Sequence, residues 1–346
     1  MPVTVVVGGQ FGSEGKGKVA HFLAREMRAA AVIRVGGPNS GHTAVNSRNE
    51  AIIFQQLPTA ALLPNVLCVV PAGGYLDPQR LLHEIRSVEL PRERLIIDPW
   101  AVVIEDADRD RERLVGLREA IGSTLSGTGR ALQRRIGRVG GVRFAKDERS
   151  IASYVSPAVP ILRKLLDRKE RVLIEGTQGF GLSILHGLDY PHATSRDTTA
   201  ANFVAEAGLS PLDVDDVVLV IRAFPIRVGG NSGDLPGEID WDVVTRESGS
   251  PVGVVEYTSV TRAVRRVARF SPDVVRSAIA VNNPTKLALN HLDYVDYAAG
   301  QVNRPTPRVG LFVRQVSSSI GRPIDYFGFG PATVVPSYEA EMRQLA

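Results

Sequence analysis

The sequence predicts an α/β fold in which a largely parallel central sheet is flanked by helices. Short aliphatic and β-branched runs alternate along the chain with amphipathic stretches of helical period, and a glycine- and lysine-rich loop joins the first run to the first such stretch. Uninterrupted apolar strands need cover on both faces, and this alternation is typical of parallel sheets. The expected buried strands are residues 3–7, 31–35, 66–70, 171–175 and 217–221, and the expected helices cover residues 78–85, 106–121 and 158–166.

The chain of 346 residues is expected to form one domain, residues 1–346, with long functional loops. It shows no internal repeat, no low-complexity tract and no Pro/Ser/Gly-rich linker that divides it. An apolar content of 44% is enough to fill a sizeable core, which argues against general disorder.

The composition limits the cellular compartment and the binding partners that we expect for this protein. The single cysteine, Cys68, excludes a disulfide framework and a cysteine-only metal site, and no segment has the roughly 18 apolar residues of a membrane span. We therefore expect a cytoplasmic protein that has no membrane partner. The net charge is only +4, yet most of the basic residues are arginine, whose planar fork suits phosphate and carboxylate. This favours small anionic ligands over nucleic acid.

The glycine loop at residues 8–18 follows a strand and opens a helix, so its N–H groups and the helix N-terminus can converge on an anion. It is not a strict Walker A motif, because Gln10 stands where that motif has glycine and Gly17 stands where it has serine or threonine. The two lysines in the loop favour a phosphate ligand over a purely structural turn.

Residues 9–18 read Gly-Gln-Phe-Gly-Ser-Glu-Gly-Lys-Gly-Lys, which closely resembles the signature of the adenylosuccinate synthetase family. Ser13 stands where that family carries its catalytic aspartate. Further blocks resemble family segments in the same order, and the resemblance extends from about residue 3 to residue 331. These blocks are residues 37–43, 121–129, 175–179, 186–195, 222–229, 258–266, 290–293 and 328–331.

The resemblance implies a P-loop-like fold and a ligase that forms a C–N bond. Family members use a nucleoside triphosphate and Mg²⁺ to phosphorylate the 6-oxygen of a purine nucleotide, after which the amino group of L-aspartate displaces the phosphate. The chemistry is positioning combined with charge stabilisation.

The resemblance also implies roles for individual residues. The catalytic residues are Ser13, Lys16, His42 and Gln178. The substrate nucleotide is bound by Ser13, Asn39, Ser123, Thr124, Arg138, Gln178, Thr194, Val228 and Gly229. Aspartate is bound by Thr258, Ser259, Val260, Thr261 and Arg265. The triphosphate is bound by Gly15, Lys16, Gly17, Gly41, His42, Thr43, Arg265, Asn290, His291, Asp293, Gly328 and Gly330, and Mg²⁺ by Ser13 and Gly41. A homodimer is expected, with Arg138 shared across subunits.

Two departures from the family pattern indicate the substrate. Ser13 is short and neutral, which leaves room beside N1 and the 2-amino group of guanine, and Ala263 replaces a family arginine that contacts the ribose hydroxyl. Together they favour dGMP, the substrate of the family's phage branch, the 2-aminoadenylosuccinate synthetases. The expected product is N6-succino-2-amino-2′-deoxyadenylate, used for 2-aminoadenine DNA in the host cytoplasm.

The phosphate donor is expected to be ATP or dATP rather than GTP. Asp293 of the family's guanine-reading segment is present, but His291 replaces its lysine and Gly328 replaces the serine of a neighbouring segment. Three candidates remain for the group that deprotonates N1: Ser13, a water molecule and a phosphate oxygen.

Two alternatives remain. The first is an adenylosuccinate synthetase of the short archaeal type that acts on IMP. The second is a nucleotide-sensing or DNA-associated protein without turnover, which the arginine-rich residues 109–149 motivate. That segment fits equally a solvated helix face, an anion-binding surface or a subunit contact.

Overall fold

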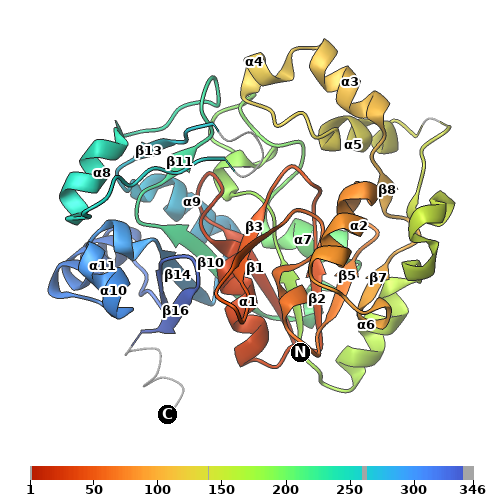
Figure 1. Ribbon diagram of the computed structural model, residues 1–346, viewed down its shortest axis with the longest axis horizontal. Coiled ribbons are helices and arrows are strands. Elements are labelled where there is room, and N and C mark those ends of the chain that lie inside the picture. The colour runs from red at the N-terminus through yellow and green to blue at the C-terminus, as the bar shows by residue number, and fades with distance from the viewer. Residues whose placement is uncertain (1, 139, 259–262, 338–346) are drawn as a thin grey trace.

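The computed structural model describes residues 2–138, 140–258 and 263–337, and within these a nine-stranded sheet forms the centre of the molecule (Figure 1). The strand order is β16-β15-β14-β10-β1-β9-β2-β5-β7, and every neighbouring pair is parallel except β15 and β16. The strands are β1 Val3–Gly8, β2 Ala31–Arg34, β5 Leu67–Val70, β7 Leu95–Ile97, β9 Val172–Glu175, β10 Val214–Arg222, β14 Lys286–Asn290, β15 Tyr326–Phe329 and β16 Thr333–Pro336. The predicted α/β fold with a largely parallel sheet is confirmed.

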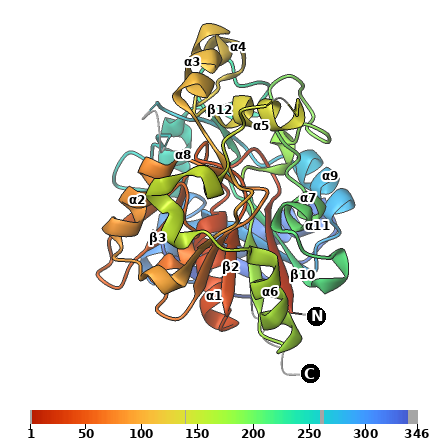
Figure 2. The same cartoon turned by 90° about the vertical axis from the view of Figure 1, so that its right-hand side faces the viewer.

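Helices cover both faces of this sheet because alternate strand residues point to opposite sides. Val6 of β1 packs in the apolar cluster that contains α1, whereas Val5 packs in the larger cluster that contains α6, α7, α9 and α11. In the side view, α7, α9 and α11 gather on one side of the strands (Figure 2). The helices are α1 Lys16–Glu26, α2 Pro78–Ser87, α3 Asp106–Leu114, α4 Leu117–Ile121, α5 Thr128–Ile136, α6 Ala158–Asp167, α7 Ala200–Ala207, α8 Trp241–Ser248, α9 Pro272–Asn282, α10 Tyr297–Val302 and α11 Pro307–Ile320.

Smaller elements surround the sheet. Two antiparallel groups are formed by β3 His42–Val45 with β4 Ala51–Phe54, and by β13 Arg266–Ala268 with β11 Ile226–Arg227 and β12 Glu238–Ile239. The short strands β6 Tyr75–Leu76 and β8 Val102–Val103 pair in parallel. Turns of 3-10 helix occupy Thr59–Leu62, Arg92–Arg94, Ala145–Asp147, Arg149–Tyr154, Phe180–Leu182, Pro211–Asp213 and Leu292–Tyr294.

The five predicted strands are present, but the helix expected over residues 106–121 is wrong. It divides into α3 and α4, because Gly116 adopts a left-handed φ of 65° that a continuous helix does not allow. The divided segment stands at the top of both views (Figures 1 and 2). In contrast, α2 begins where its sequence signals predict, since Asp77 accepts a hydrogen bond from the Arg80 N–H (3.1 Å) and Pro78 occupies the first turn.

The order of the strands sets the position of the loops that follow them. Strand β1 lies between β9 and β10, so the chain leaves it in one direction toward β2 and β5 and returns on the other side through β10 and β14. Open α/β sheets bind ligands at the carboxyl ends of strands around such a reversal. No helix in the described parts of the chain is long and apolar enough to cross a membrane.

Candidate active site

A cavity of about 870 Å³ opens at the carboxyl ends of β1, β9, β10 and β14. It contains most of the residues that the sequence analysis assigned to catalysis and binding. The assigned residues that line it are Ser13, Gly15, Lys16, Gly17, Asn39, Gly41, His42, Thr43, Ser123, Thr124, Gln178, Val228, Gly229, Thr258, Arg265, His291, Asp293 and Gly330. Ala263 lines it as well. The structure therefore brings together segments that lie more than 300 residues apart in the sequence, and their individual roles stay predictions.

Four assigned residues do not line this cavity. Arg138 is exposed beyond the end of α5, and Thr194 is half-buried with its N–H donating to the Leu182 carbonyl (2.7 Å). Asn290 is fully buried at the end of β14, with Gly328 packed against its side chain. Ser259, Val260 and Thr261 lie outside the described residues.

The glycine loop contains a buried carboxylate, the side chain of Glu14. Glu14 Oε1 accepts hydrogen bonds from the N–H groups of Gln10 (3.1 Å) and Gly12 (2.8 Å), and Oε2 lies 2.6 Å from Lys16 Nζ. A Cβ at Gly8 would lie 2.8 Å from Glu14 Oε2, so the loop packs closely on the end of β1. Because Glu14 is turned inward, it shapes the loop and holds Lys16 at the cavity wall.

Ser13 lies at the cavity wall in a left-handed conformation with a φ of 55°. Its carbonyl accepts a hydrogen bond from Arg222 Nη1 (3.0 Å). Gln178, on the loop after β9, also lines the cavity and has a positive φ of 59°. Non-glycine residues rarely adopt this conformation, and such positions cluster at functional sites.

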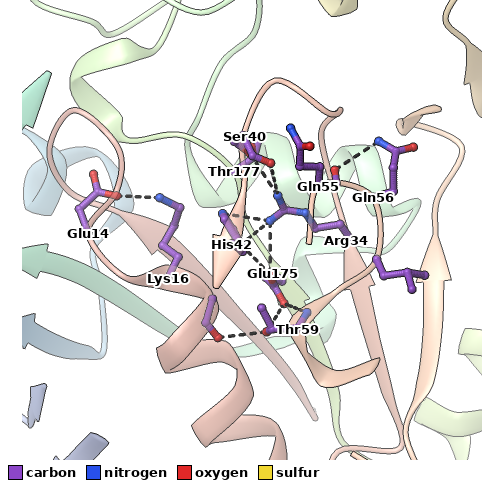
Figure 3. A network of polar contacts seen from close by, with 12 residues as sticks. Glu14, Lys16, Arg34, Ser40, His42, Gln55, Gln56, Thr59, Glu175 and Thr177 are labelled. Atoms are coloured by element: carbon purple, nitrogen blue, oxygen red, sulfur yellow. Dashed lines mark hydrogen bonds and ion pairs between the residues drawn. The ribbon is translucent and has the colours of Figure 1, made fainter. Parts of the chain in front are cut away.

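His42 is the centre of a buried polar network (Figure 3). Its Nδ1 lies 2.6 Å from Glu175 Oε1, while Glu175 Oε2 accepts hydrogen bonds from the N–H (2.9 Å) and hydroxyl (2.8 Å) of Thr59. The guanidinium of Arg34 lies against the imidazole, with Nη1 3.0 Å from His42 Nε2 and 3.3 Å from Glu175 Oε1. Arg34 Nη2 also donates to the Ser40 hydroxyl (3.1 Å), which ties the network to the loop before β3.

Burial, followed by the positive charge of Arg34, lowers the pKa of His42 to about 3. Although burial alone raises the pKa of Glu175, its hydrogen bond with His42 and the charge of Arg34 bring that pKa below its ordinary value. The neutral imidazole therefore donates its Nδ1–H to an ionised carboxylate, which fixes its tautomer and orientation.

The sequence analysis assigned no role to Arg34, Thr59 or Glu175. For two of them a signal was present, since Arg34 and Glu175 are charged residues that end otherwise apolar strands, β2 and β9. Charged residues are almost never fully buried unless they are paired, so such a position in a parallel sheet indicates a partner at the carboxyl edge.

A second buried charge cluster joins β10 to the loop before β13. Glu256 contacts Arg222 and lies 2.9 Å from Arg265 Nη1. Burial raises the pKa of Glu256, but the cations, Arg222 above all, outweigh this and hold that pKa well below its ordinary value. Glu256 is thus an ionised counter-charge and a poor proton acceptor.

The end of the cavity beyond β14 carries the residues predicted to read the base of the triphosphate. His291 has a φ of 61°, and burial, followed by the charge of Arg222, lowers its pKa well below the ordinary range. Asp293 Oδ1 accepts a hydrogen bond from the Gly330 N–H (3.0 Å), and Lys18 Nζ donates to the Gly330 carbonyl (2.8 Å). Burial lowers the pKa of Lys18 to about 8.

The described residues contain no cluster of three or more His, Cys, Asp or Glu side chains that could hold a metal ion. The two residues expected to bind Mg²⁺, Ser13 and Gly41, line the cavity and offer a hydroxyl and a backbone carbonyl. Mg²⁺ favours oxygen ligands, keeps several waters and is often held through substrate phosphates. This donor set fits an ion that arrives with a nucleotide rather than one held in a protein cage.

Comparisons with known proteins agree with this geometry. The family model described as adenylosuccinate synthetase matches residues 5–147 and 142–300. The adenylosuccinate synthetase of Methanocaldococcus jannaschii is 35% identical over 338 residues, which cover 95% of this chain and 94% of that protein. The corresponding enzyme of Thermococcus onnurineus is 35% identical over 339 residues, with 96% of each chain covered.

Two solved structures extend the comparison. The succinoaminodeoxyadenylate synthetase of cyanophage S-2L, bound to dGMP and dATP, has a TM-score of 0.82 and 30% identity and covers 99% of this chain and 98% of its own. The fully ligated adenylosuccinate synthetase of Plasmodium falciparum has a TM-score of 0.84 at 19% identity, covering 97% of this chain and 100% of its own, which shows the shared fold. The chain therefore belongs to the adenylosuccinate synthetase family, ligases that form a C–N bond on purine nucleotides.

Proposed function

We propose that this enzyme joins L-aspartate to the 6-position of dGMP, driven by hydrolysis of ATP or dATP. The product is N6-succino-2-amino-2′-deoxyadenylate, a precursor of 2-aminoadenine DNA in the cytoplasm of a phage-infected cell. The observation that carries the proposal is Ser13 at the cavity wall, in a loop whose one acidic residue, Glu14, is buried and bound to Lys16. The loop thus presents no carboxylate to the purine.

The absence of a loop carboxylate suits guanine. A carboxylate at residue 13 would crowd the side of the base that carries N1 and the 2-amino group, whereas a serine hydroxyl is small and can donate or accept a hydrogen bond. Ala263, also at the cavity wall, has no polar atom in its side chain. A 2′-deoxyribose therefore loses no hydrogen bond there. The cyanophage enzyme with the same fold binds dGMP, which supports this assignment.

The proposed chemistry has two steps. The terminal phosphoryl group moves from the triphosphate to the 6-oxygen as the purine loses its N1 proton, and the diphosphate leaves. The aspartate nitrogen, as the neutral amine, then forms a bond to C6 and loses a proton, while the C6–O6 bond breaks and the 6-oxygen departs as phosphate. Lys16 and the loop N–H groups stabilise the transferring phosphoryl group, and His42, held by Glu175, faces the 6-oxygen. The N1 proton goes to Ser13, a water or a phosphate oxygen.

Magnesium would enter with the triphosphate, held by its phosphates together with Ser13 and Gly41. When bound, the ion neutralises phosphate charge and orients the terminal phosphoryl group.

The donor assignment rests on the base-reading end of the cavity. His291 is partly buried and its pKa lies well below the ordinary range, so it offers a neutral ring rather than the positive charge of a lysine. The cyanophage enzyme was bound to dATP, which also supports an adenine donor.

The active enzyme is proposed to be a homodimer in which Arg138 reaches the neighbouring subunit's nucleotide. Arg138 is exposed and has a φ of 52°, and its side chain makes no hydrogen bond or ion pair with the residues that the structure describes. A side chain presented in this way is available to a second subunit.

The second candidate is adenylosuccinate synthetase activity on IMP, which the archaeal relatives of that name favour. One assay separates the two: phosphate release with Mg²⁺, L-aspartate and ATP, comparing dGMP, GMP and IMP, with the product identified by mass. Aspartate-dependent turnover of dGMP with little turnover of IMP supports the proposal. Turnover of IMP alone establishes the second candidate, and no turnover with any nucleotide leaves a binding protein.

Variants at residue 13 test whether the size and the hydroxyl of Ser13 account for the use of dGMP. Ser13→Asp is expected to lower kcat/KM for dGMP at least about tenfold, because the longer side chain crowds the 2-amino side of the base. Ser13→Ala is the matched control for size, and it should keep dGMP binding but lower kcat if the hydroxyl orients the base. Unchanged kcat/KM in Ser13→Asp would remove the steric argument, and unchanged turnover in Ser13→Ala would remove the orienting role.

A further inference from the structure

Arg118 differs from the other cations that line the cavity. Lys16 is held by Glu14, Arg265 by Glu256, and Lys18 donates to the Gly330 carbonyl. Arg118 lines the same cavity and has no hydrogen bond or ion pair through its side chain among the residues that the structure describes. It is an arginine whose donors are available to a ligand.

The backbone around Arg118 is held firmly in place. Helix α4 is only five residues long and is bounded by Gly116 and Gly122, both with left-handed φ values of 65° and 68°. Asn231, from the loop after β11, donates its Nδ2 to the Ala120 carbonyl (2.8 Å) and accepts from His192 Nε2 (3.2 Å). The position of α4 relative to the opposite cavity wall is therefore set by side-chain contacts.

The surroundings of Arg118 are suited to a phosphate group. Ser123 and Thr124 follow α4 directly and line the cavity, with Val228 and Gly229 on the facing loop. Hydroxyls and small residues allow a phosphate to approach, and a guanidinium binds it with directional hydrogen bonds. Glu119, next to Arg118 in the chain, also lines the cavity. The charges of these two side chains cancel at long range, so Arg118 would attract a phosphate only through direct contact.

We infer that Arg118 is a further substrate-binding residue, which supplies a cation from the same subunit to the 5′-phosphate of the bound purine nucleotide. The inference rests on the proposed function, since it requires a nucleotide substrate in this cavity. Arg118 would contact the nucleotide from the same subunit, whereas Arg138 is expected to contact it from the neighbouring subunit.

The test compares Arg118→Ala with the wild-type dimer in steady-state kinetics. The KM for dGMP should rise about 10- to 100-fold, the loss of a charge-assisted hydrogen bond, with kcat changed less than about twofold. Arg118→Lys should recover part of the loss, because a point charge replaces the fork. The control is Arg113→Ala, since Arg113 is exposed on α3, pairs with Asp110 (2.6 Å) and does not line the cavity.

A second measurement separates a phosphate contact from a structural role. Deoxyguanosine lacks the phosphate, so its inhibition constant should be the same in wild type and Arg118→Ala. An equal loss for deoxyguanosine and dGMP, an unchanged KM for dGMP, or a rise only in the KM for aspartate would each overturn the inference. If IMP proves to be the substrate, the same comparison uses IMP and inosine, so failure of the dGMP assignment is distinguishable from failure of this one.

Discussion

The layer beneath the cavity and the rim of the cavity are built differently. The strand-end group, Arg34, Glu175, Arg222 and Asn290, consists of the last residues of four parallel strands, none of them more than 3% exposed. The rim group, Arg118, Ser123, Thr124, Val228 and Asn231, lies on α4 and two loops. Buried polar groups must be satisfied within the protein, whereas loop residues can leave donors for a ligand. We therefore expect the strand-end group to hold His42 and the glycine loop in position, and the rim group to contact the substrate.

Removing Glu175 is expected to have the largest effect. Glu175→Ala leaves Arg34 buried without its counter-charge and His42 without its partner, which should cost about 3–5 kcal/mol of unfolding free energy. The remaining folded enzyme should lose at least about 100-fold in kcat, because the imidazole is no longer held. Denaturant unfolding and single-turnover kinetics measure the two effects.

Asp98→Ala serves as the control for Glu175→Ala. Asp98 is a buried carboxylate that accepts from the Ala158 N–H (3.0 Å) and does not line the cavity. The Asp98→Ala variant should have a lower free energy of unfolding, while its folded fraction keeps the wild-type kcat. If Glu175→Ala behaved in the same way, the strand-end group would be structural only.

Gly328→Ala should have a moderate effect. A Cβ at this position collides with Asn290 Oδ1 and comes within 3.0 Å of Lys18 Nζ, so about 1–3 kcal/mol of stability should be lost. Asn290 donates to the Glu14 carbonyl (2.7 Å), so the KM for ATP should rise as the glycine loop shifts.

Thermal unfolding of Gly328→Ala, alone and combined with Asn290→Ala, checks this explanation. The double variant should recover part of the loss, since the collision is removed. Gly310→Ala on α11 is the control, because the nearest atom to its Cβ, on Arg314, lies 3.6 Å away. Equal effects at both glycines would contradict the packing argument.

His42→Asn should change how stability depends on pH. The pKa of His42 is about 3 in the folded protein against an ordinary 6.5, so the unfolded chain binds more protons between these values. Stability of the wild type is therefore retained above pH 6.5 and decreases as the pH falls toward 3, by about 2 kcal/mol at pH 5 from this group. Urea unfolding at pH 7.5 and pH 5 should show a smaller decrease in His42→Asn, and identical decreases would show that His42 is not buried as a neutral group.

Mixing two inactive variants tests the predicted sharing of Arg138 and gives the smallest signal. Arg138→Ala and Lys16→Ala subunits, unfolded and refolded together, should recover about a quarter of wild-type activity, because half of the dimers then hold one intact site. Arg118→Ala mixed with Lys16→Ala should recover none beyond the Arg118→Ala background. Rescue in the second mixture would place Arg118 across the subunit interface.

The prediction from sequence succeeded for the strands and for the segments that meet at the cavity. The five strands were predicted from local hydrophobic patterns, and the segments around His42, Gln178 and Asp293 from the family resemblance; these segments and the glycine loop line one cavity. The helix predicted over residues 106–121 was wrong, because one left-handed glycine interrupts the helical pattern. Asn290 and Gly328, which were assigned to the triphosphate, lie beneath the cavity wall. The single-domain prediction and the individual residue roles stay predictions.

The sequence by itself determined the fold class, the family and the residues available for chemistry, because hydrophobic period and short motifs depend only on neighbours in the chain. Only the tertiary structure decided that Glu175 holds His42, that Asn290 donates to the Glu14 carbonyl, and that the Arg118 side chain has no partner in the described parts of the chain. These contacts join residues 133 and 276 positions apart, and the order of the parallel strands brings Glu175 and Asn290 to the same edge of the sheet. Local sequence does not encode that order, and so the pairing of buried charges emerges only when the sheet is assembled.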